Sequence, residues 1–118
     1  MKITIKKGGS LWWKKFHFSI QSDNNEILGR SRKVGTVEEC ISLINRIKKF
    51  CETGIGLKWD IDKNYNGKQK YHIRLINDDG EDIEILFWSE QYFNQKDCQD
   101  TIELIIQGIN TAEIKYQL

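Results

Sequence analysis

Residues 12–20 have the sequence Trp-Trp-Lys-Lys-Phe-His-Phe-Ser-Ile, in which apolar and polar side chains alternate from Phe16 to Ile20. Successive side chains of a β-strand point to opposite faces, so this alternation predicts a strand with one buried side and one solvent-facing side. Phe16, Phe18 and Ile20 belong to the buried side. The opposite side receives Trp13, Lys15, His17 and Ser19.

The same alternation returns at residues 71–75, Tyr-His-Ile-Arg-Leu. A short alternating run precedes each copy, at residues 3–5 and 59–61, and a third strand is expected after each copy, around residues 26–31 and 83–89. The chain is therefore predicted to contain a three-strand unit twice. Turn signals separate the strands at residues 8–9, 23–25, 66–67 and 78–80.

Each unit is predicted to end in an amphipathic helix, at residues 36–50 and 94–109. Thr36 and Glu39 form a capping box, Asn94 offers an equivalent cap, and Gly54 is placed to end the first helix. Apolar residues at three-and-four spacing form one face of each helix. These residues are Val37, Cys40, Ile41, Ile44, Ile47 and Cys51 in the first helix, and Cys98, Ile102, Ile105, Ile106 and Ile109 in the second.

We therefore expect an α+β fold in which two tandem β-β-β-α repeats, at residues 1–54 and 55–118, form a single domain spanning residues 1–118. The strands are expected to form one antiparallel sheet, with both helices packed on one face and a short C-terminal strand at residues 113–116. The chain has the length of one ordinary domain, and neither repeat has enough apolar surface for a core of its own. A shared core is the expected solution.

Residues 85–92, Ile-Leu-Phe-Trp-Ser-Glu-Gln-Tyr, precede a polar cap and a helix and resemble the ILxSExY segment of the YegP-like family. The preceding turn and strand are also similar to that family. The resemblance implies a small, uncharacterised bacterial protein with tandem repeats and no known reaction. The first copy departs from the pattern, because residues 31–34 lack the Glu and the Tyr and Gly29 replaces a bulky residue.

Charge is distributed unevenly along the chain, although the net charge is only +1. Eleven Lys and Arg oppose four Asp and Glu in residues 1–50, whereas seven oppose thirteen in residues 51–118. This asymmetry would steer an anionic partner to the first part, or let the two parts or neighbouring copies attract each other. The sequence has no apolar run long enough to span a bilayer and no signal-like start, so we expect a cytoplasmic protein without a membrane partner.

The sequence offers little support for metal or catalytic chemistry. Residues 62–67 resemble the opening of an EF-hand loop, but Ile73 occupies the position that needs a bidentate Glu. His17 and His72 are expected on the sheet face opposite the helix cysteines, which disfavours a zinc site or a Cys–His pair. Phosphate-binding and hydrolase motifs are also missing. We therefore expect no metal, no other cofactor and no catalytic residue, and a small enzyme is the least favoured alternative.

The sheet face without helices is the candidate binding surface. The most favoured hypothesis is a non-catalytic binding module that self-associates as a homodimer through this face, because interfaces are rich in aromatic and Arg residues. An unknown protein or ligand is another candidate partner. The alternative is a nucleic-acid-binding protein, since rings stack on bases and cations contact phosphates. The candidate binding residues are Trp13, Lys15, His17, His72, Arg74 and Trp88, and the nucleic-acid alternative adds Arg30, Arg32 and Lys33.

Overall fold

The computed structural model describes residues 1–8, 14–63, 69–76, 82–89, 92 and 94–118, with side chains between 62 and 84 left out. The strands are β1 (Lys2–Gly8), β2 (Lys15–Gln21), β3 (Ile27–Ser31), β4 (Leu57–Lys63), β5 (Gln69–Ile76), β6 (Asp82–Trp88) and β7 (Glu113–Gln117). The helices are α1 (Val37–Thr53) and α2 (Gln95–Gly108), and the short 3-10 helix η1 (Ile109–Thr111) follows α2. The expected elements are therefore present in the expected order.

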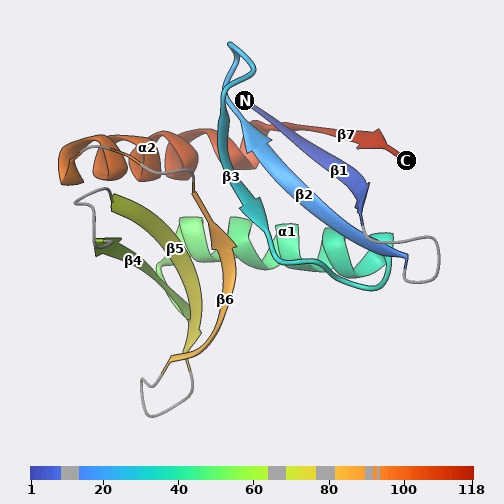
Figure 1. Ribbon diagram of the computed structural model, residues 1–118, viewed down its shortest axis with the longest axis horizontal. Helices are drawn as coiled ribbons and strands as arrows, with labels where there is room; N and C mark the ends of the chain where they lie inside the picture. The colour runs from blue at the N-terminus through green and yellow to red at the C-terminus, as the bar shows by residue number, and fades with distance from the viewer. Residues whose placement is uncertain (9–13, 64–68, 77–81, 90–91, 93) are drawn as a thin grey trace.

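All seven strands form one sheet in the order β4-β5-β6-β3-β2-β1-β7 (Figure 1). Neighbouring strands are antiparallel except at one edge, where β7 runs parallel to β1 and places Ile114 opposite Ile3. The strands β1–β6 form the expected antiparallel arrangement, and the C-terminal strand β7 makes the sheet as a whole mixed. No turn links β1 to β7, which come from opposite ends of the chain, so no hairpin sets the direction of this pairing.

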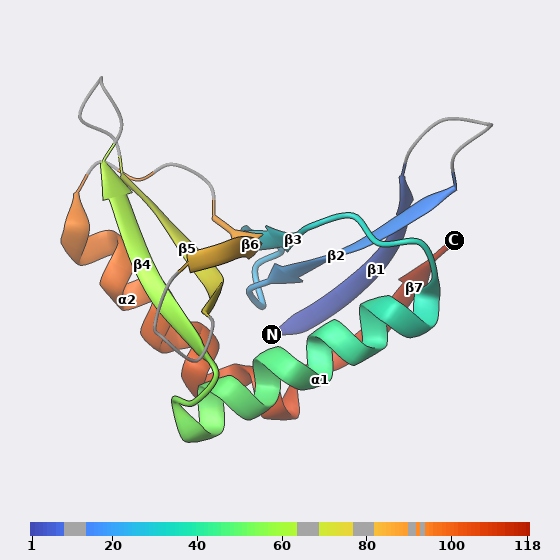
Figure 2. The same cartoon turned by 90° about the horizontal axis from the view of Figure 1, so that it is seen from below.

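Both helices cover the same face of the sheet, as Figure 2 shows from below. The core lies between this face and the helices. Burial of these side chains supplies the main force that holds the helices on the sheet. The fully buried large residues are Phe18, Phe87, Ile3, Ile5, Ile20, Ile44, Ile47, Leu86, Ile105 and Ile109.

The helix ends follow the capping signals in the sequence. The Thr36 side chain accepts a hydrogen bond from the Glu39 amide at 3.1 Å, and the Asn94 side chain accepts one from the Asp97 amide at 2.8 Å. Gly54 has φ 72° and donates its N–H to the Phe50 carbonyl at 2.7 Å, which closes α1. Glycine adopts this left-handed conformation without the steric cost that other residues meet.

The buried helix faces differ in detail from the expected ones. Leu43 and Phe50 of α1 are buried as well, and the Phe50 ring lies 5.8 Å from that of Trp59 in β4. On α2, Ile106 is 37% exposed, because it lies beside the inward line of Cys98, Ile105 and Ile109. Neither helix has the length and apolar character that a membrane crossing requires.

The two halves of the sheet meet where β3 pairs with β6, and Ser31 lies opposite Phe87. The Phe87 ring stacks on Phe18 of β2, with ring centroids 6.1 Å apart. Gly29 makes room for Phe87, since a Cβ at Gly29 would lie 2.2 Å from the end of that ring. The Ser31 hydroxyl accepts the Phe18 N–H at 2.9 Å, which ties β2 to β3.

Some sequence expectations fall on residues outside the described part of the chain. They are the turn at residues 78–80, most of the turn and EF-hand-like segment at residues 62–67, and Gly9 of the first turn. These expectations remain predictions.

Candidate functional site

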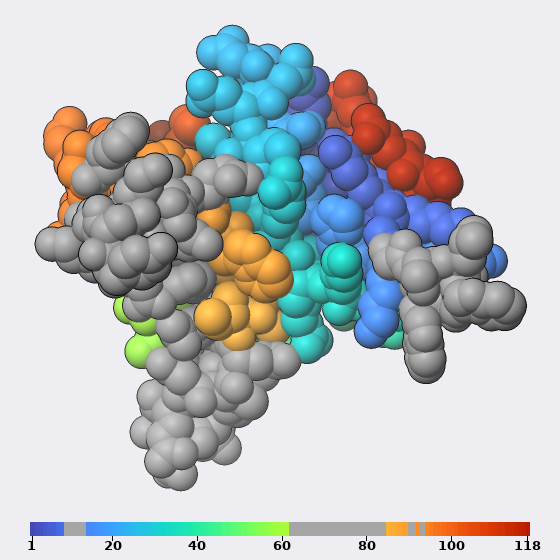
Figure 3. All heavy atoms as spheres, in the orientation of Figure 1, coloured from blue at the N-terminus to red at the C-terminus, as the bar shows by residue number. Residues whose placement is uncertain are grey.

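The helix-free face of β1–β3 is the candidate site. Phe18 and Ile20 of β2 are buried against the helices, so His17 and Ser19 point to the other face. Strand pairing places Lys6 opposite His17 and Arg30 opposite Ser19, and residues opposite each other share a face. Figure 3 shows this face, with β2, β3 and β6 side by side at its centre.

His17 lies among cations on this face. We define the basic cluster as Lys6, His17, Arg30 and Lys33. A Cβ at Gly8 would lie 3.2 Å from His17 Nδ1 and 3.8 Å from Lys33 Cε, so the missing side chain leaves room for both groups. The cluster therefore gathers side chains from β1, β2, β3 and the segment that follows β3.

The positive charge of the basic cluster affects the pKa of His17. Burial lowers the pKa of His17 below its ordinary value, and the charges of Lys33, Lys6 and Arg30 lower this pKa further. At neutral pH the imidazole is therefore uncharged and the cluster has three positive charges. An anion bound there would gain Coulomb energy and would raise the His17 pKa.

Two polar atoms on this face have no hydrogen-bond partner among the described residues. They are Nδ1 of half-buried His17 and Oγ of Ser19, which is only 1% exposed. Buried polar groups in folded proteins are nearly always hydrogen-bonded, so each unpaired atom calls for an explanation. Both atoms lie beneath the accessible surface of this face.

The structure brings several predicted site residues together. Trp88 lies opposite Arg30 on the neighbouring strand and is 39% exposed, and Lys15 is exposed at the start of β2. Trp13 lies outside the described part of the chain. His72 pairs with Trp88 in the backbone, and Arg74 pairs with residue 85, but their side chains are not described.

Lys6 is a site residue that the sequence analysis missed. The sequence does indicate which face Lys6 occupies, since Ile3 and Ile5 alternate with Lys2, Thr4 and Lys6 along β1. The alternation gives the face of Lys6 but does not give its neighbour. Only the pairing of β1 with β2 places Lys6 beside His17.

Arg32 lies apart from the basic cluster. The strand β3 ends at Ser31, and the chain then bends toward α1, where Val34 forms a bridge with Phe16. Arg32 lines a cavity beside α1 rather than the helix-free face. The nucleic-acid surface predicted from the sequence is therefore divided, with Arg30 and Lys33 at one site and Arg32 at another.

The three cysteines are not suited to catalysis or metal binding. Cys40 and Cys98 are buried, and Cys51 is half-buried. Burial raises the pKa of all three thiols, that of Cys51 to about 11, which keeps them protonated and unreactive at neutral pH. Within the described ranges, no group of three His, Cys, Asp or Glu side chains is arranged to hold a metal ion.

Two solved structures share this architecture. The UPF0339 protein SO3888 from Shewanella oneidensis superposes with a TM-score of 0.74 at 16% identity, covering 98% of this chain and 92% of that one. The yegP protein from E. coli gives a TM-score of 0.74 at 15% identity, covering 98% of this chain and 91% of that one. This chain has the YegP-like fold.

The resemblance predicted from residues 85–92 is therefore confirmed at the level of the fold. No family model and no curated protein matches the sequence. The E. coli yegP protein is itself a protein of unknown function, so the YegP-like fold brings no reaction with it. Function has to be argued from the residues on the surface.

Proposed function

We propose that this chain is a non-catalytic binding module that holds single-stranded nucleic acid on the helix-free face of its sheet. The observation that supports this proposal most is the basic cluster, in which Lys6, Arg30 and Lys33 surround an uncharged His17. Three positive charges on a twisted sheet suit a flexible polyanion.

The chemistry of such binding would divide into two parts. Lys6, Arg30 and Lys33 would contact phosphates, which supplies affinity without regard to sequence. Trp88 is 39% exposed and lies opposite Arg30, where its ring offers a surface on which a base can stack.

The proposal is tested by fluorescence anisotropy with a labelled oligothymidylate of about fifteen nucleotides, at increasing salt concentration. For three or four phosphate contacts, the logarithm of the affinity should fall with the logarithm of salt with a slope of about −2 to −3. The double variant Lys6→Gln, Lys33→Gln should bind more weakly and with a shallower slope.

A matched control removes the same charge from the helices. The variant Lys48→Gln, Lys96→Gln should keep the slope of the natural protein, because these residues lie on the other side of the sheet. Absence of binding at low salt, or an equal loss in both double variants, would remove the proposal.

Self-association through the same face is a second candidate, favoured by the charge asymmetry. The basic first part of the chain forms β1–β3, and the acidic second part contributes β4–β6 on the other side of the β3–β6 joint. A two-fold axis along this joint would lay the basic half of one copy over the acidic half of another. Sedimentation should then detect a dimer that salt dissociates, and a monomer at low and high salt removes this candidate.

The proposal includes an internal duplication and a bacterial, cytoplasmic setting. Duplication is supported by the sheet order. From the β3–β6 pair outward, β2 and β1 follow β3 on one side, and β5 and β4 follow β6 on the other, so that equivalent strands occupy equivalent positions. Three free cysteines suit a reducing compartment. Fractionation of cells that produce the protein tests the location.

A further inference from the structure

Two cavities lie one after the other along one side of α1 and share Arg46. The smaller has a volume of 160 Å³ and the larger 420 Å³. The larger cavity alone is within the range of typical small-molecule sites, which begins at about 300 Å³. The α1 residues that line them are Glu39, Ser42, Leu43 and Arg46 for the smaller cavity, and Arg46, Lys49, Phe50 and Thr53 for the larger.

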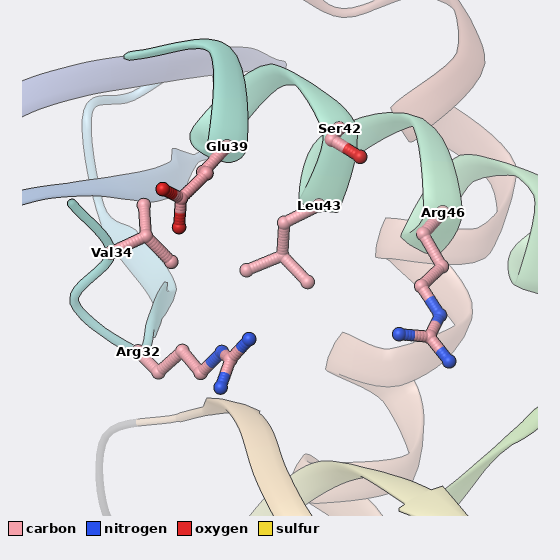
Figure 4. A pocket seen from close by; sticks show the side chains of 6 residues that line it. All are labelled: Arg32, Val34, Glu39, Ser42, Leu43 and Arg46. Atoms are coloured by element: carbon pink, nitrogen blue, oxygen red, sulfur yellow. The ribbon is translucent and has the colours of Figure 1, made fainter. Parts of the chain in front are cut away.

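The smaller cavity has cations on opposite walls. Arg32 enters it from the segment after β3 and Arg46 from α1, and Figure 4 shows both guanidinium groups facing the space with Leu43 between them. Glu39 also lines this cavity, on the same side as Arg32 in Figure 4, and its Oε1 lies 3.4 Å from the position of a Cβ at Gly35. Planar guanidinium groups suit the two oxygens of a carboxylate or a phosphate.

The larger cavity is mainly apolar. Phe50 and Leu57 form its buried wall, and Ile55 borders it with 77% of its surface exposed. Lys49 and Arg46 add positive charge at its border, and no ion pair of either residue is found within the described part of the chain. An apolar chamber edged by cations is complementary to an apolar body with one negative group.

We propose that the two cavities form one site for an amphipathic anion, a carboxylate attached to an acyl chain of medium length. The acyl chain fills the larger cavity against Phe50, Leu57 and Ile55. The carboxylate lies in the smaller cavity between Arg46 and Arg32. This site is separate from the basic cluster, since α1 covers the opposite face of the sheet.

The test uses 8-anilinonaphthalene-1-sulfonate, an amphipathic anion whose fluorescence rises in an apolar site. The neutral compound N-phenyl-1-naphthylamine has the same ring system and lacks the charge. The proposal predicts that the anion binds at least tenfold more tightly than the neutral compound, because a charge-assisted hydrogen bond is made only to the anion. Decanoate should displace the bound anion, and decanol should displace it far less.

Variants of surface side chains test the location of the binding site without disturbing the core. Arg46→Met keeps the apolar stem and should weaken binding of the anion about tenfold, whereas Ile55→Asp should weaken it by placing a negative charge at the larger cavity. Lys48→Met changes a neighbouring cation of α1 that lines neither cavity and should leave binding unchanged. No binding, equal binding of the neutral compound, or equal affinity in Arg46→Met and Lys48→Met would overturn the proposal.

Discussion

At the scale of single residues, Gly29 and Phe87 act as a complementary pair at the centre of the sheet. Gly29 belongs to β3 and Phe87 to β6, so the fit joins the two halves of the chain. The Phe87 ring is fully buried and has little freedom to move. The departure of Gly29 from the YegP-like pattern thus has a structural reason in this chain.

We predict that Gly29→Ala lowers the free energy of unfolding by about 1–3 kcal/mol, because the new methyl group overlaps the Phe87 ring. Urea denaturation measures this change. In the double variant Gly29→Ala, Phe87→Leu, the smaller side chain relieves the overlap, so the two effects should not add. The control Gly35→Ala should change stability little, since a Cβ at this exposed position makes only an ordinary contact. Equal losses at Gly29 and Gly35 would contradict the fit.

His17 makes the stability of the folded protein depend on pH. Its pKa is lowered in the folded state by burial and then by Lys33, Lys6 and Arg30, so the unfolded chain binds the proton more readily. The stabilising contribution is therefore complete above the ordinary pKa of about 6.5 and is lost as the pH falls.

We predict that the stability of the natural protein decreases between about pH 7 and pH 5 more steeply than that of His17→Gln. Thermal unfolding of both proteins across this range measures the difference, and His72 is present in both. Parallel curves for the two proteins would show that His17 titrates as it does in an unfolded chain. Oligothymidylate should raise the His17 pKa if phosphates bind at the basic cluster.

At the scale of elements, β7 is the outermost strand on one side of the sheet and covers the edge of β1. It pairs with β1 from Lys2 to Lys6, and Ile114 packs against the core. Removing residues 113–118 would expose the hydrogen-bonding groups of β1, and such an edge favours pairing with other chains.

We predict that a chain ending at Ala112 is less stable by roughly 2 kcal/mol, the order of one buried aliphatic side chain, and aggregates more readily. Urea denaturation and light scattering measure the two effects. A chain ending at Gln117 removes only exposed Leu118 and should behave as the natural protein. If the shorter chain were equally stable, β7 would have no role in completing the sheet.

At the scale of the whole molecule, local patterns predicted the elements and their buried sides. The alternation in residues 16–20 and the caps at Thr36 and Asn94 act within a few residues, so the sequence displays them directly. The parallel pairing of β7 with β1 joins opposite ends of the chain and has no local signal. The fold class was predictable for this reason, and the mixed character of the sheet was not.

The candidate site also combines features that the local sequence predicts with features that depend on contacts between distant segments. The face that His17 occupies follows from the alternation, whereas its neighbours Lys6 and Lys33 follow from strand pairing and from the bend after β3. The same bend sends Arg32 to the cavity beside α1. Arg32 therefore lies apart from its sequence neighbours Arg30 and Lys33, which both remain beside His17.

The most direct test of the proposed function is a map of backbone amide chemical shifts during titration with oligothymidylate at low salt. The changes should concentrate on the helix-free face, around Lys6, His17, Arg30, Lys33 and Trp88, while amides of α1 and α2 stay in place. Changes confined to the helices, or none at saturating concentrations, would contradict the assignment of nucleic-acid binding to this face.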